Sequence, residues 1–392
     1  MKKLNIAVIG GGASGIYFAL NCKKSLPQSK ITIFEKNERP LKKVKASGNG
    51  RCNLSNENTD IKFYNTDNFI IANALKKYGL AVLINFYNDL HLPLTVEDSR
   101  VYPATESSET VVRTLKNACE ANNIKIITDT NIENLTGYNF DYIVLATGSN
   151  AGTMGSKDAY KLCEGLKINP AFPSLTGISV ENENFENISG IRTTAKASLY
   201  IDRKEIYTEI GQIQFNKNGL SGIPILQISH FITEKNIKKA KIFLDFFPFT
   251  EENNLRKILY EIKKDFAKLS LFSLLDSLVH HRLGMFLSKQ AKIKCKDRQI
   301  SDLSDSEIEN LIKILKSKEF TIGKLNDFKS AQCSKGGIDL SEINDDFSLK
   351  SNNKIFVIGE LLDVNGMCGG YNLQFAFSSA KAAAEGIKNR YD

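Results

Sequence analysis

The sequence lacks the segments that direct a chain into or across a membrane. No apolar run approaches the roughly 20 residues that a membrane-spanning helix needs. The apolar stretch from Leu4 to Ile9 follows two lysines, as in a signal peptide, but it runs directly into three glycines. It is too short for the hydrophobic region of such a peptide, and no cleavage-like segment follows. A buried strand that enters a tight turn explains it better. We therefore expect a soluble, cytoplasmic protein without membrane contacts.

The sequence also has few residues that bind metals or form disulfides. Its seven cysteines are scattered and form no CxxC pair, and their odd number fits a reducing compartment. The four histidines show no metal-ligand spacing. We expect no metal site. There is no internal repeat and no low-complexity tract.

The composition of the 392 residues is that of a globular protein, with 42% hydrophobic and 24% charged residues. This length allows a large core divided into two or three units. The net charge of +8 is spread over short lysine-rich pieces such as Lys42-Lys43 and Lys238-Lys239. A solvated surface is the favoured interpretation, and a nucleic-acid groove is the less favoured one. A site for an anionic cofactor would also use part of this charge.

The two ends of the chain have the texture of one α/β domain. Residues 4–9 and 30–35 are short apolar runs typical of buried parallel strands, and a helical pattern begins at Ala13 between them. Near the other end, residues 354–358 predict a strand and residues 374–388 a helix rich in alanine. Further elements of the first part are helices over 73–90 and 109–121, the second capped by Ser107 or Ser108, and strands over 124–128 and 142–145.

The middle of the chain differs from its ends. Residues 172–247 hold short alternating stretches broken by glycine and proline, which indicate a small β domain. Residues 250–316 have helical periodicity. We therefore predict an α/β fold with one domain formed by both chain ends, an inserted β unit and an inserted helical unit. The predicted boundaries are 1–170 and 336–392 for the α/β domain, 171–248 and 317–335 for the β insert, and 249–316 for the helical insert.

A glycine-rich turn after the first strand predicts dinucleotide binding. Gly10, Gly12 and Gly15 form a GxGxxG pattern that opens a helix, and Glu35 follows 20 residues after Gly15 at the end of the next strand. Gly10 permits the tight turn, Gly12 lets a pyrophosphate approach the backbone, and Gly15 lets the helix pack on the strand. The helix N-terminus then offers free N–H groups to the phosphates. The Glu35 carboxylate is placed to accept hydrogen bonds from the adenosine ribose.

Further strand-to-turn elements favour FAD over NAD. The segment Gly359 to Asp363 follows the C-terminal strand, and Asp363 is placed to bond a ribityl chain. The segment Ala146-Thr147-Gly148 follows the strand that ends at Leu145. A simple two-domain NAD enzyme does not need such a closing element. There is no second nucleotide fingerprint, so NAD(P)H is left open as a transient electron donor.

Several blocks in order over nearly the whole chain resemble the aminoacetone-oxidase-like family of bacterial FAD-dependent flavoproteins, which includes proteins linked to bile-acid dehydroxylation. The blocks are 10–15 (GGGASG), 47–53 (SGNGRCN), 100–103 (RVYP), 146–148 (ATG), 219–222 (GLSG), 336–337 (GG), 359–363 (GELLD) and 369–374 (GGYNLQ). The resemblance implies that the α/β domain formed by both chain ends is a Rossmann-type FAD-binding domain, with an inserted β-barrel-like domain and an inserted helical domain. The chain departs from the family pattern at Asn49 and Ser149, where glycine is common.

The two most specific blocks add candidate flavin contacts. Arg51 offers a planar positive fork to a phosphate or a flavin edge, and Lys43 is a candidate helper. Backbone amides of the last block, with Asn372 and Gln374, are candidates for the pyrimidine edge of the isoalloxazine. Ile132 is a candidate for adenine contacts, although core packing explains it equally well. The predicted cofactor-binding residues are Gly10, Gly12, Ala13, Ser14, Gly15, Glu35, Lys36, Lys43, Gly50, Arg51, Cys52, Asn53, Ile132, Ala146, Thr147, Gly148, Gly359, Glu360, Asp363, Gly370, Tyr371, Asn372, Leu373 and Gln374.

The sequence predicts an FAD-dependent oxidoreductase but assigns no catalytic residue. Cys52 and Cys368 are single residues in glycine-rich loops, and we favour small loop residues over a redox pair. The flavin would pass a hydride or two electrons between a small-molecule substrate or NAD(P)H and an acceptor. The alternatives are an FAD-dependent nucleic-acid-modifying enzyme and a non-catalytic flavin-binding regulator. The substrate and the oligomeric state are left open.

Overall fold

The chain folds into two compact units, each described separately below. The computed structural model describes residues 3–135, 139–152, 155, 159–295 and 297–392. Unit 1 spans residues 1–174 and 328–392, and unit 2 spans residues 175–327. Both ends of the chain therefore build unit 1, and unit 2 is an insertion between its two parts.

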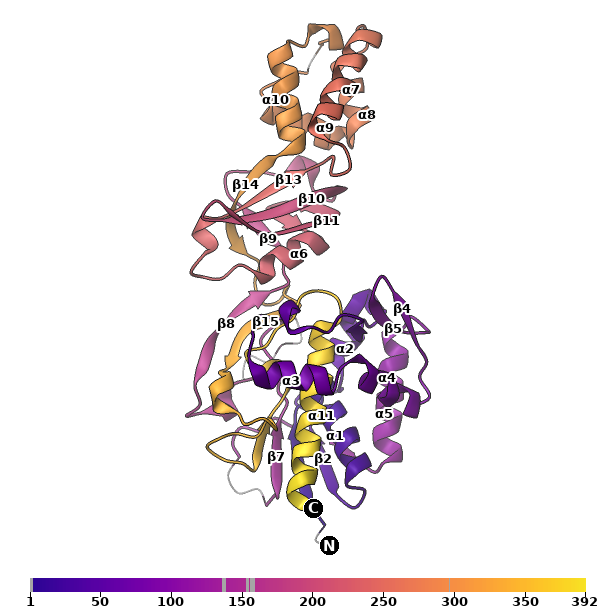
Figure 1. Ribbon diagram of the computed structural model, residues 1–392, viewed down its shortest axis with the longest axis vertical. Helices are drawn as coiled ribbons and strands as arrows, with labels where there is room; N and C mark the ends of the chain where they lie inside the picture. The colour runs from indigo at the N-terminus through magenta and orange to yellow at the C-terminus, as the bar shows by residue number, and fades with distance from the viewer. Residues whose placement is uncertain (1–2, 136–138, 153–154, 156–158, 296) are drawn as a thin grey trace. The chain divides into compact units, whose positions relative to one another are not determined.

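A five-stranded parallel sheet forms the centre of unit 1. Its order is β16 (Ile355–Val357), β7 (Tyr142–Leu145), β1 (Asn5–Ile9), β2 (Lys30–Phe34) and β6 (Lys125–Ile127). The central strand β1 is rich in apolar residues because both of its faces are covered. Ile6 and Val8 lie on one face, against helix α1 (Ala13–Ser25), while Ala7 and Ile9 lie on the other. Helix α11 (Tyr371–Tyr391) packs along α1, as Figure 1 shows.

Smaller elements complete unit 1. They are the helices α2 (Lys42–Ala46), α3 (Phe69–Lys77), α4 (Leu80–Asp89) and α5 (Ser108–Ala121), the sheet β3 (Ser55–Asn56), β5 (Arg100–Pro103) and β4 (Leu94–Glu97), and the pair β8 (Ile168–Ser174) and β15 (Cys333–Ile338). The single helix expected over 73–90 is in fact two helices, since the chain breaks at Tyr78 and Gly79 caps α4. Ser107 occupies the cap position of α5, but its side chain makes no capping bond.

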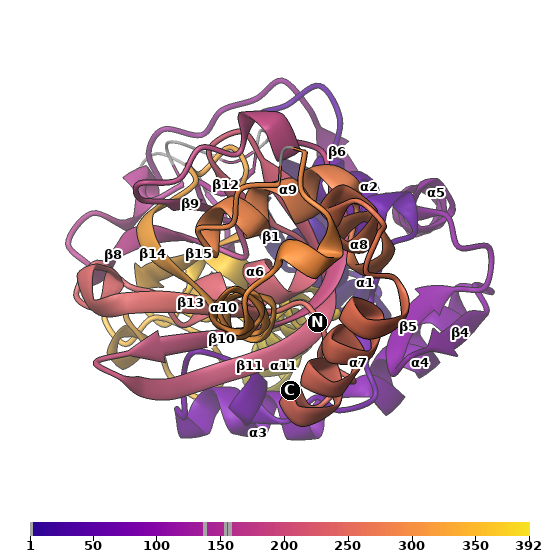
Figure 2. The same ribbon diagram turned by 90° about the horizontal axis from the view of Figure 1, so that it is seen from above.

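Unit 2 contains a closed six-stranded barrel. The strand order is β10 (Arg192–Ile201), β11 (Lys204–Asn216), β12 (Gly219–Ser221), β9 (Ile178–Val180), β14 (Lys318–Leu325) and β13 (Ala240–Asp245). Figure 2 shows β10 between β11 and β13, with which it pairs antiparallel. Phe185, Phe215 and Phe320 fill the interior with edge-to-face ring contacts at centroid distances of 5.2 and 5.7 Å. Helix α6 (Ile223–His230) packs on β11.

Between β13 and β14, the described residues of unit 2 form four further α-helices. They are α7 (Glu252–Asp265), α8 (Leu271–Leu278), α9 (His281–Gln290) and α10 (Asp305–Lys316). Their buried leucines and isoleucines recur at helical spacing, which made the segment recognisable from the sequence. Together with the sheet of unit 1 and the barrel, these helices confirm the predicted fold class.

The unit boundaries differ from those expected. They fall at Ser174 and Phe328, not at residues 170 and 335. Strands β8 and β15 pair with each other inside unit 1 and not with the barrel. Short alternating strands look alike in the sequence whichever sheet they join, so composition did not separate these two from the barrel strands.

Within the described part of the chain, no single helix is long and apolar enough to span a bilayer; the bent pair α3 and α4 meets that criterion only when taken together.

Candidate functional site

The glycine-rich segments meet at one edge of the parallel sheet in unit 1. Gly10 follows β1, and a Cβ atom on it would lie 2.3 Å from the carbonyl oxygen of Ala146, which follows β7. Gly359 follows β16, and a Cβ atom there would lie 2.6 Å from Oγ of Ser14 in the first turn of α1. The carboxyl ends of parallel strands share an edge, and ligands of open α/β sheets bind there. The fold thus brings together three segments that are far apart in the sequence.

The fold itself does not require glycine at position 12, in contrast to the two other glycines of the motif. Gly10 has φ +112°, and a Cβ on Gly15 would lie 2.1 Å from the carbonyl oxygen of Gly10. Both glycines are therefore needed for the turn. Gly12 has φ −77° and ψ −171°, which any residue adopts, and no atom lies within 4 Å of a Cβ placed on it. The open space lies at the N-terminus of α1, where backbone N–H groups have no partner within the helix. This arrangement fits the pyrophosphate of a dinucleotide.

Glu35 is fixed at the end of β2 beside this turn. Its side chain is buried and accepts hydrogen bonds from the backbone N–H of Gly11 at 2.8 Å and from the backbone and side chain of Asn37 at 2.8 and 2.6 Å. A carboxylate has about four acceptor positions, so these bonds leave capacity for a ribose hydroxyl. Lys36, the next residue, is exposed.

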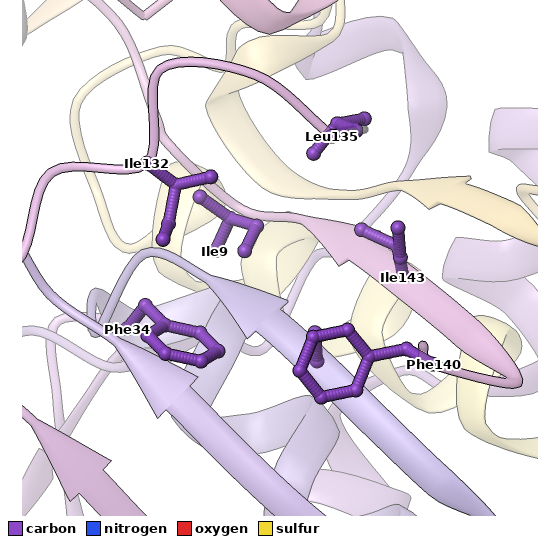
Figure 3. A pocket seen from close by; sticks show the side chains of 7 residues that line it. Ile9, Phe34, Ile132, Leu135, Phe140 and Ile143 are labelled. Atoms are coloured by element: carbon purple, nitrogen blue, oxygen red, sulfur yellow. The ribbon is translucent and has the colours of Figure 1, made fainter. Parts of the chain in front are cut away.

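Ile132 lies at an apolar pocket on the opposite sheet face from α1. Figure 3 shows it with Ile9, Phe34, Leu135, Phe140 and Ile143, and Ala7 also lines the pocket. Every lining side chain is apolar, so the pocket offers an adenine ring packing surfaces. Core packing also accounts for Ile132, and its contact with adenine stays a prediction.

The segment from Ser47 to Asn53 is a tight loop with left-handed backbone. Asn49 has φ +54° and Gly50 φ +87°. Cys52 also has a positive φ, +60°, and its thiol is buried, which raises its pKa to about 11. With its amide nitrogen toward the carbonyl oxygens of Ser55 and Val101, Asn53 accepts a hydrogen bond from the N–H of Gly370 at 3.1 Å. This loop therefore fixes the turn that precedes α11.

Arg51 is engaged by acidic side chains of the same unit. Its guanidinium pairs with Glu97 of β4 and, at 3.1 Å, with Glu106, and it stacks over the ring of Tyr102 at 4.3 Å. The positive fork predicted to meet a phosphate or a flavin edge is thus compensated by two carboxylates. Its role toward a cofactor stays a prediction.

The acidic residues of the C-terminal segment also hold other parts of unit 1. Glu360 pairs with Lys43 at 3.0 Å and accepts a hydrogen bond from the N–H of Ser334 at 3.1 Å. Asp363 accepts hydrogen bonds from the side chains of Asn65 and Asn169 at 3.1 and 2.9 Å. The N–H of Gly336 donates a third bond to it, at 2.9 Å. These three bonds leave one acceptor position of the carboxylate, as at Glu35, so a contact between Asp363 and a ribityl chain stays a prediction.

The side chains of Asn372 and Gln374 are likewise used by the fold. Asn372 bonds both the N–H and the carbonyl oxygen of Gly366, at 2.8 and 2.9 Å. Gln374 is fully buried and bonds Ser55, Tyr78 and Ser378. The Gln374 amide has both N–H groups engaged and is fully buried, so it does not reach the pyrimidine edge of a flavin, contrary to our expectation. Asn372 is half-buried and keeps one N–H and one acceptor position, so its contact with a flavin stays a prediction.

The remaining predicted positions lie around these segments. Gly148 has φ +72°, and Thr147 Oγ1 donates to the carbonyl oxygen of Ala159 at 2.8 Å. Tyr371 stacks on Phe63 at a centroid distance of 4.8 Å, and burial raises its pKa to about 12. Ala13 and Leu373 lie in the first turns of α1 and α11. All seven cysteines are free thiols, and Cys368 lies 3.8 Å from the side-chain oxygen of Gln332.

Comparison with known proteins identifies the family. The model of the HI0933-like protein Rossmann domain matches residues 4–386. The chain belongs to the HI0933-like family. A curated relative, the 3-dehydro-bile acid delta(4,6)-reductase of Clostridium scindens, is 32% identical over 406 residues, covering 97% of this chain and 99% of the relative. The ribosomal RNA dihydrouridine synthase of Haemophilus influenzae is 26% identical over 98% of both chains, and that of Escherichia coli is 24% identical over 99% and 98%.

Membership in the HI0933-like family makes this chain an FAD-dependent oxidoreductase. The resemblance drawn from the sequence motifs is thereby confirmed. One of the two departures from the family pattern has a simple explanation: Asn49 occupies a left-handed backbone position, which glycine adopts freely and asparagine tolerates. At the other departure, Ser149 is buried and its hydroxyl accepts a hydrogen bond from the N–H of Ala151 at 3.2 Å.

Sequence reasoning did not single out one buried ionisable residue of unit 1. Lys335 in β15 is buried, and burial lowers the pKa of its ammonium group to about 8. The signal that could have found it is its position directly before Gly336 and Gly337, a pair that the sequence motifs include.

Proposed function

We propose that this protein reduces a carbon–carbon double bond conjugated to a carbonyl group in a small molecule, with FAD carrying electrons from NAD(P)H. The observation that carries the proposal is the 32% identity, over 97% of the chain, to a relative named for delta(4,6) reduction of a 3-dehydro-bile acid. Dihydrouridine synthesis, named in the other two relatives, also saturates a ring double bond next to a carbonyl. The two substrates differ greatly, but the bond that is reduced is of the same kind.

The residues of unit 1 support the binding half of this proposal. The first turn of α1 and the open space at Gly12 would hold the pyrophosphate, and Glu35 would hold the adenosine ribose. Bound FAD supplies hydride transfer. The part played by the protein is to orient the flavin and to adjust its electrostatic environment. No side chain is assigned to the proton transfer that completes the reduction of the double bond.

A steroid-like or other flat enone is our first candidate substrate, because the bile-acid reductase shares more identity with this chain than the RNA-modifying relatives do. A uridine in RNA is the second candidate. It is favoured by two relatives and by the net charge of +8. Phosphate contacts make RNA binding fall steeply with salt, which distinguishes the two candidates.

The test begins with the visible spectrum of the purified protein and chromatography of the cofactor released by heat. Released FAD, with bleaching of the flavin bands by NADH or NADPH under anaerobic conditions, would support the cofactor and the donor. The reduced protein is then mixed with a 3-oxo-4,6-diene steroid or with a uridine-containing ribosomal RNA transcript, and the products are analysed by mass spectrometry.

Each outcome has a definite meaning. A gain of two hydrogens by the steroid, with reoxidation of the flavin, supports the first candidate. Reduction of uridine in the transcript, weakened by added salt, supports the second. A protein that takes up no FAD, or one whose reduced flavin is reoxidised by neither substrate class, contradicts the proposal.

A further inference from the structure

A segment of twenty residues in unit 2 contains cations and no acidic residue. Residues 277–296 include no aspartate or glutamate, and their cations are Arg282, Lys289, Lys292, Lys294 and Lys296. The segment covers helix α9 and the turn that follows it. The first four of these cationic side chains are exposed. Positive charge is therefore concentrated on one short stretch of the helical part of unit 2.

The carboxylates of the described residues do not pair with these cations. Residues 39–56 also hold five cations and no acid, but each of those cations pairs with a carboxylate. The ion pairs between described residues of helices α7 to α10 include none of Arg282, Lys289, Lys292 and Lys294. Arg282 donates to the backbone carbonyl oxygen of Asn187 at 3.3 Å, which orients the guanidinium but does not cancel its charge.

Exposed aromatic and apolar side chains lie beside the cations. Arg282, Met285 and Lys289 recur at intervals of three and four residues, so they share one face of α9. At the start of this helix the His281 ring lies 6.3 Å from the ring of Phe272 in α8, centroid to centroid. Phe272 is 44% exposed and Met285 41%. We refer to Phe272, His281, Arg282, Met285, Lys289 and Lys292 as the α8–α9 surface.

The two helices that carry this surface are packed tightly against each other. Figure 1 shows α8 and α9 side by side, and a Cβ placed on Gly284 would lie only 2.9 Å from the Cβ of Leu275. Leu275, Leu283 and Leu287 are buried. The N–H of Lys292 bonds the carbonyl oxygen of Lys289 at 3.0 Å, which keeps the turn close to the end of α9. The exposed side chains thus stand on a well-packed support and contribute little to the core.

The pairing of cations with flat rings points to the chemistry of the partner. A single-stranded nucleic acid offers phosphates to arginine and lysine and offers bases that stack on aromatic rings. An anionic lipid surface or an acidic protein would use the cations but has no flat groups that would stack on the two rings. The carboxylate of Asp276 lies 3.9 Å from Nδ1 of His281, at the aromatic end of the surface, where bases and not phosphates would bind.

We propose that the α8–α9 surface binds single-stranded RNA, with Arg282, Lys289 and Lys292 on phosphates and with Phe272 and His281 as stacking platforms for bases. This inference rests on the second candidate substrate of the proposed function, a uridine in RNA. It assigns the capture of the polynucleotide to unit 2, whereas the dinucleotide site lies in unit 1.

The experiment measures binding of a fluorescein-labelled oligouridine to the FAD-loaded protein by fluorescence anisotropy, between about 50 and 200 mM salt. Each phosphate contact on a single strand contributes about 0.7 to the slope of log affinity against log salt. The triple variant Arg282→Ala/Lys289→Ala/Lys292→Ala should therefore lose about 2 from this slope. Over this salt range its affinity should fall about 20-fold less than that of the wild type.

Two further variants separate local contacts from general charge. Lys204→Ala/Lys235→Ala/Lys238→Ala removes three exposed lysines of unit 2 outside helices α7 to α10 and should keep the wild-type slope. Phe272→Ala removes a stacking platform and should weaken binding about 5- to 150-fold without a change in slope. Thermal melting of each variant checks that unit 2 is folded. If the triple variant does not fold, Lys289→Ala alone should still lower the slope by about 0.7.

The inference is overturned if the wild type binds no RNA at the lowest salt, if the triple variant keeps the full slope, or if the control variant loses as much slope as the triple variant. Binding to vesicles containing phosphatidylserine without binding to oligouridine also overturns it. Reduction of an enone by a protein that binds no RNA contradicts the α8–α9 surface alone. RNA bound at this surface without reduction of its uridine contradicts the second candidate substrate and supports the surface.

Discussion

Replacing Gly12 by alanine should weaken FAD binding without destabilising the fold. A Cβ at this position meets no protein atom within 4 Å and occupies the space that the pyrophosphate would enter. The variant would displace the phosphates from at least one backbone N–H of the α1 turn. A hydrogen bond to a charged group contributes about 1.5–3 kcal/mol. We therefore expect Gly12→Ala to weaken FAD binding by about 10- to 150-fold.

The same variant should leave the apoprotein stable. Gly12 has φ −77° and needs no special backbone freedom. Alanine lowers the conformational entropy of the unfolded chain, which stabilises the protein, but it is a poorer N-cap than glycine, which destabilises the helix. Because these effects oppose each other, the free energy of unfolding should change by less than about 1 kcal/mol. Gly15→Ala is the contrasting variant. Its Cβ would lie 2.1 Å from the carbonyl oxygen of Gly10, so the turn itself should be disrupted.

The assay is calorimetric titration of the apoproteins with FAD, together with thermal melting of each variant. If Gly12→Ala melts like the wild type and binds FAD with the same affinity, the pyrophosphate does not lie at this turn. The glycine pattern would then be structural. If Gly12→Ala loses stability as Gly15→Ala does, the argument from open space is refuted.

Three further predictions concern stability. Glu307 pairs with Arg298 at 2.7 Å, which lowers the pKa of the Glu307 carboxyl from 4.5 to about 2. The stabilisation from this pair is therefore complete above pH 4.5 and is lost as the pH falls toward 2. Glu307→Gln should make stability less dependent on pH in that range, as measured by circular dichroism during acid unfolding. Lys316→Met leaves buried Asp245 without its ion-pair partner and should cost about 3–5 kcal/mol in guanidinium unfolding of unit 2, whereas an unchanged midpoint would show that the pair contributes little. Gln374→Leu leaves the buried polar groups of Ser55, Tyr78 and Ser378 without this hydrogen-bond partner and should lower the free energy of unfolding by at least about 2 kcal/mol. A loss of FAD affinity without a loss of stability would instead show that Gln374 contacts the flavin directly.

The parts of the site that depend on local chain geometry could be predicted from the sequence. The glycine turn and Glu35 are separated by one helix and one strand of nearly constant length, so their spacing alone locates them at neighbouring strand ends. The α/β patterns at both ends of the chain, with β and helical patterns between them, likewise indicated that both ends build one domain. These features follow from short-range periodicity and from the conformational demands of glycine.

The partners of the polar side chains could not be predicted, because they come from distant segments. Asp363 binds Asn65 and Asn169, and Gln374 binds Ser55, all more than 190 positions away in the sequence. A polar residue in a glycine-rich loop has two uses: it binds the ligand, or it binds the backbone that shapes the loop. Both uses give the same motif. Only the fold shows that the Gln374 side chain serves the second use, which is why its predicted flavin contact was wrong.

This division bears on how one fold serves different substrates. The contacts that we assign to FAD at Gly12 are made by the backbone, and the side chain of Glu35 holds this turn through the N–H of Gly11. Such a cradle tolerates many substitutions elsewhere, which agrees with 24–32% identity over nearly the full length of relatives named for a bile acid and for ribosomal RNA. FAD binding alone therefore cannot distinguish the two candidate functions. The decisive comparison is whether the reduced protein passes its electrons to an enone or to a uridine.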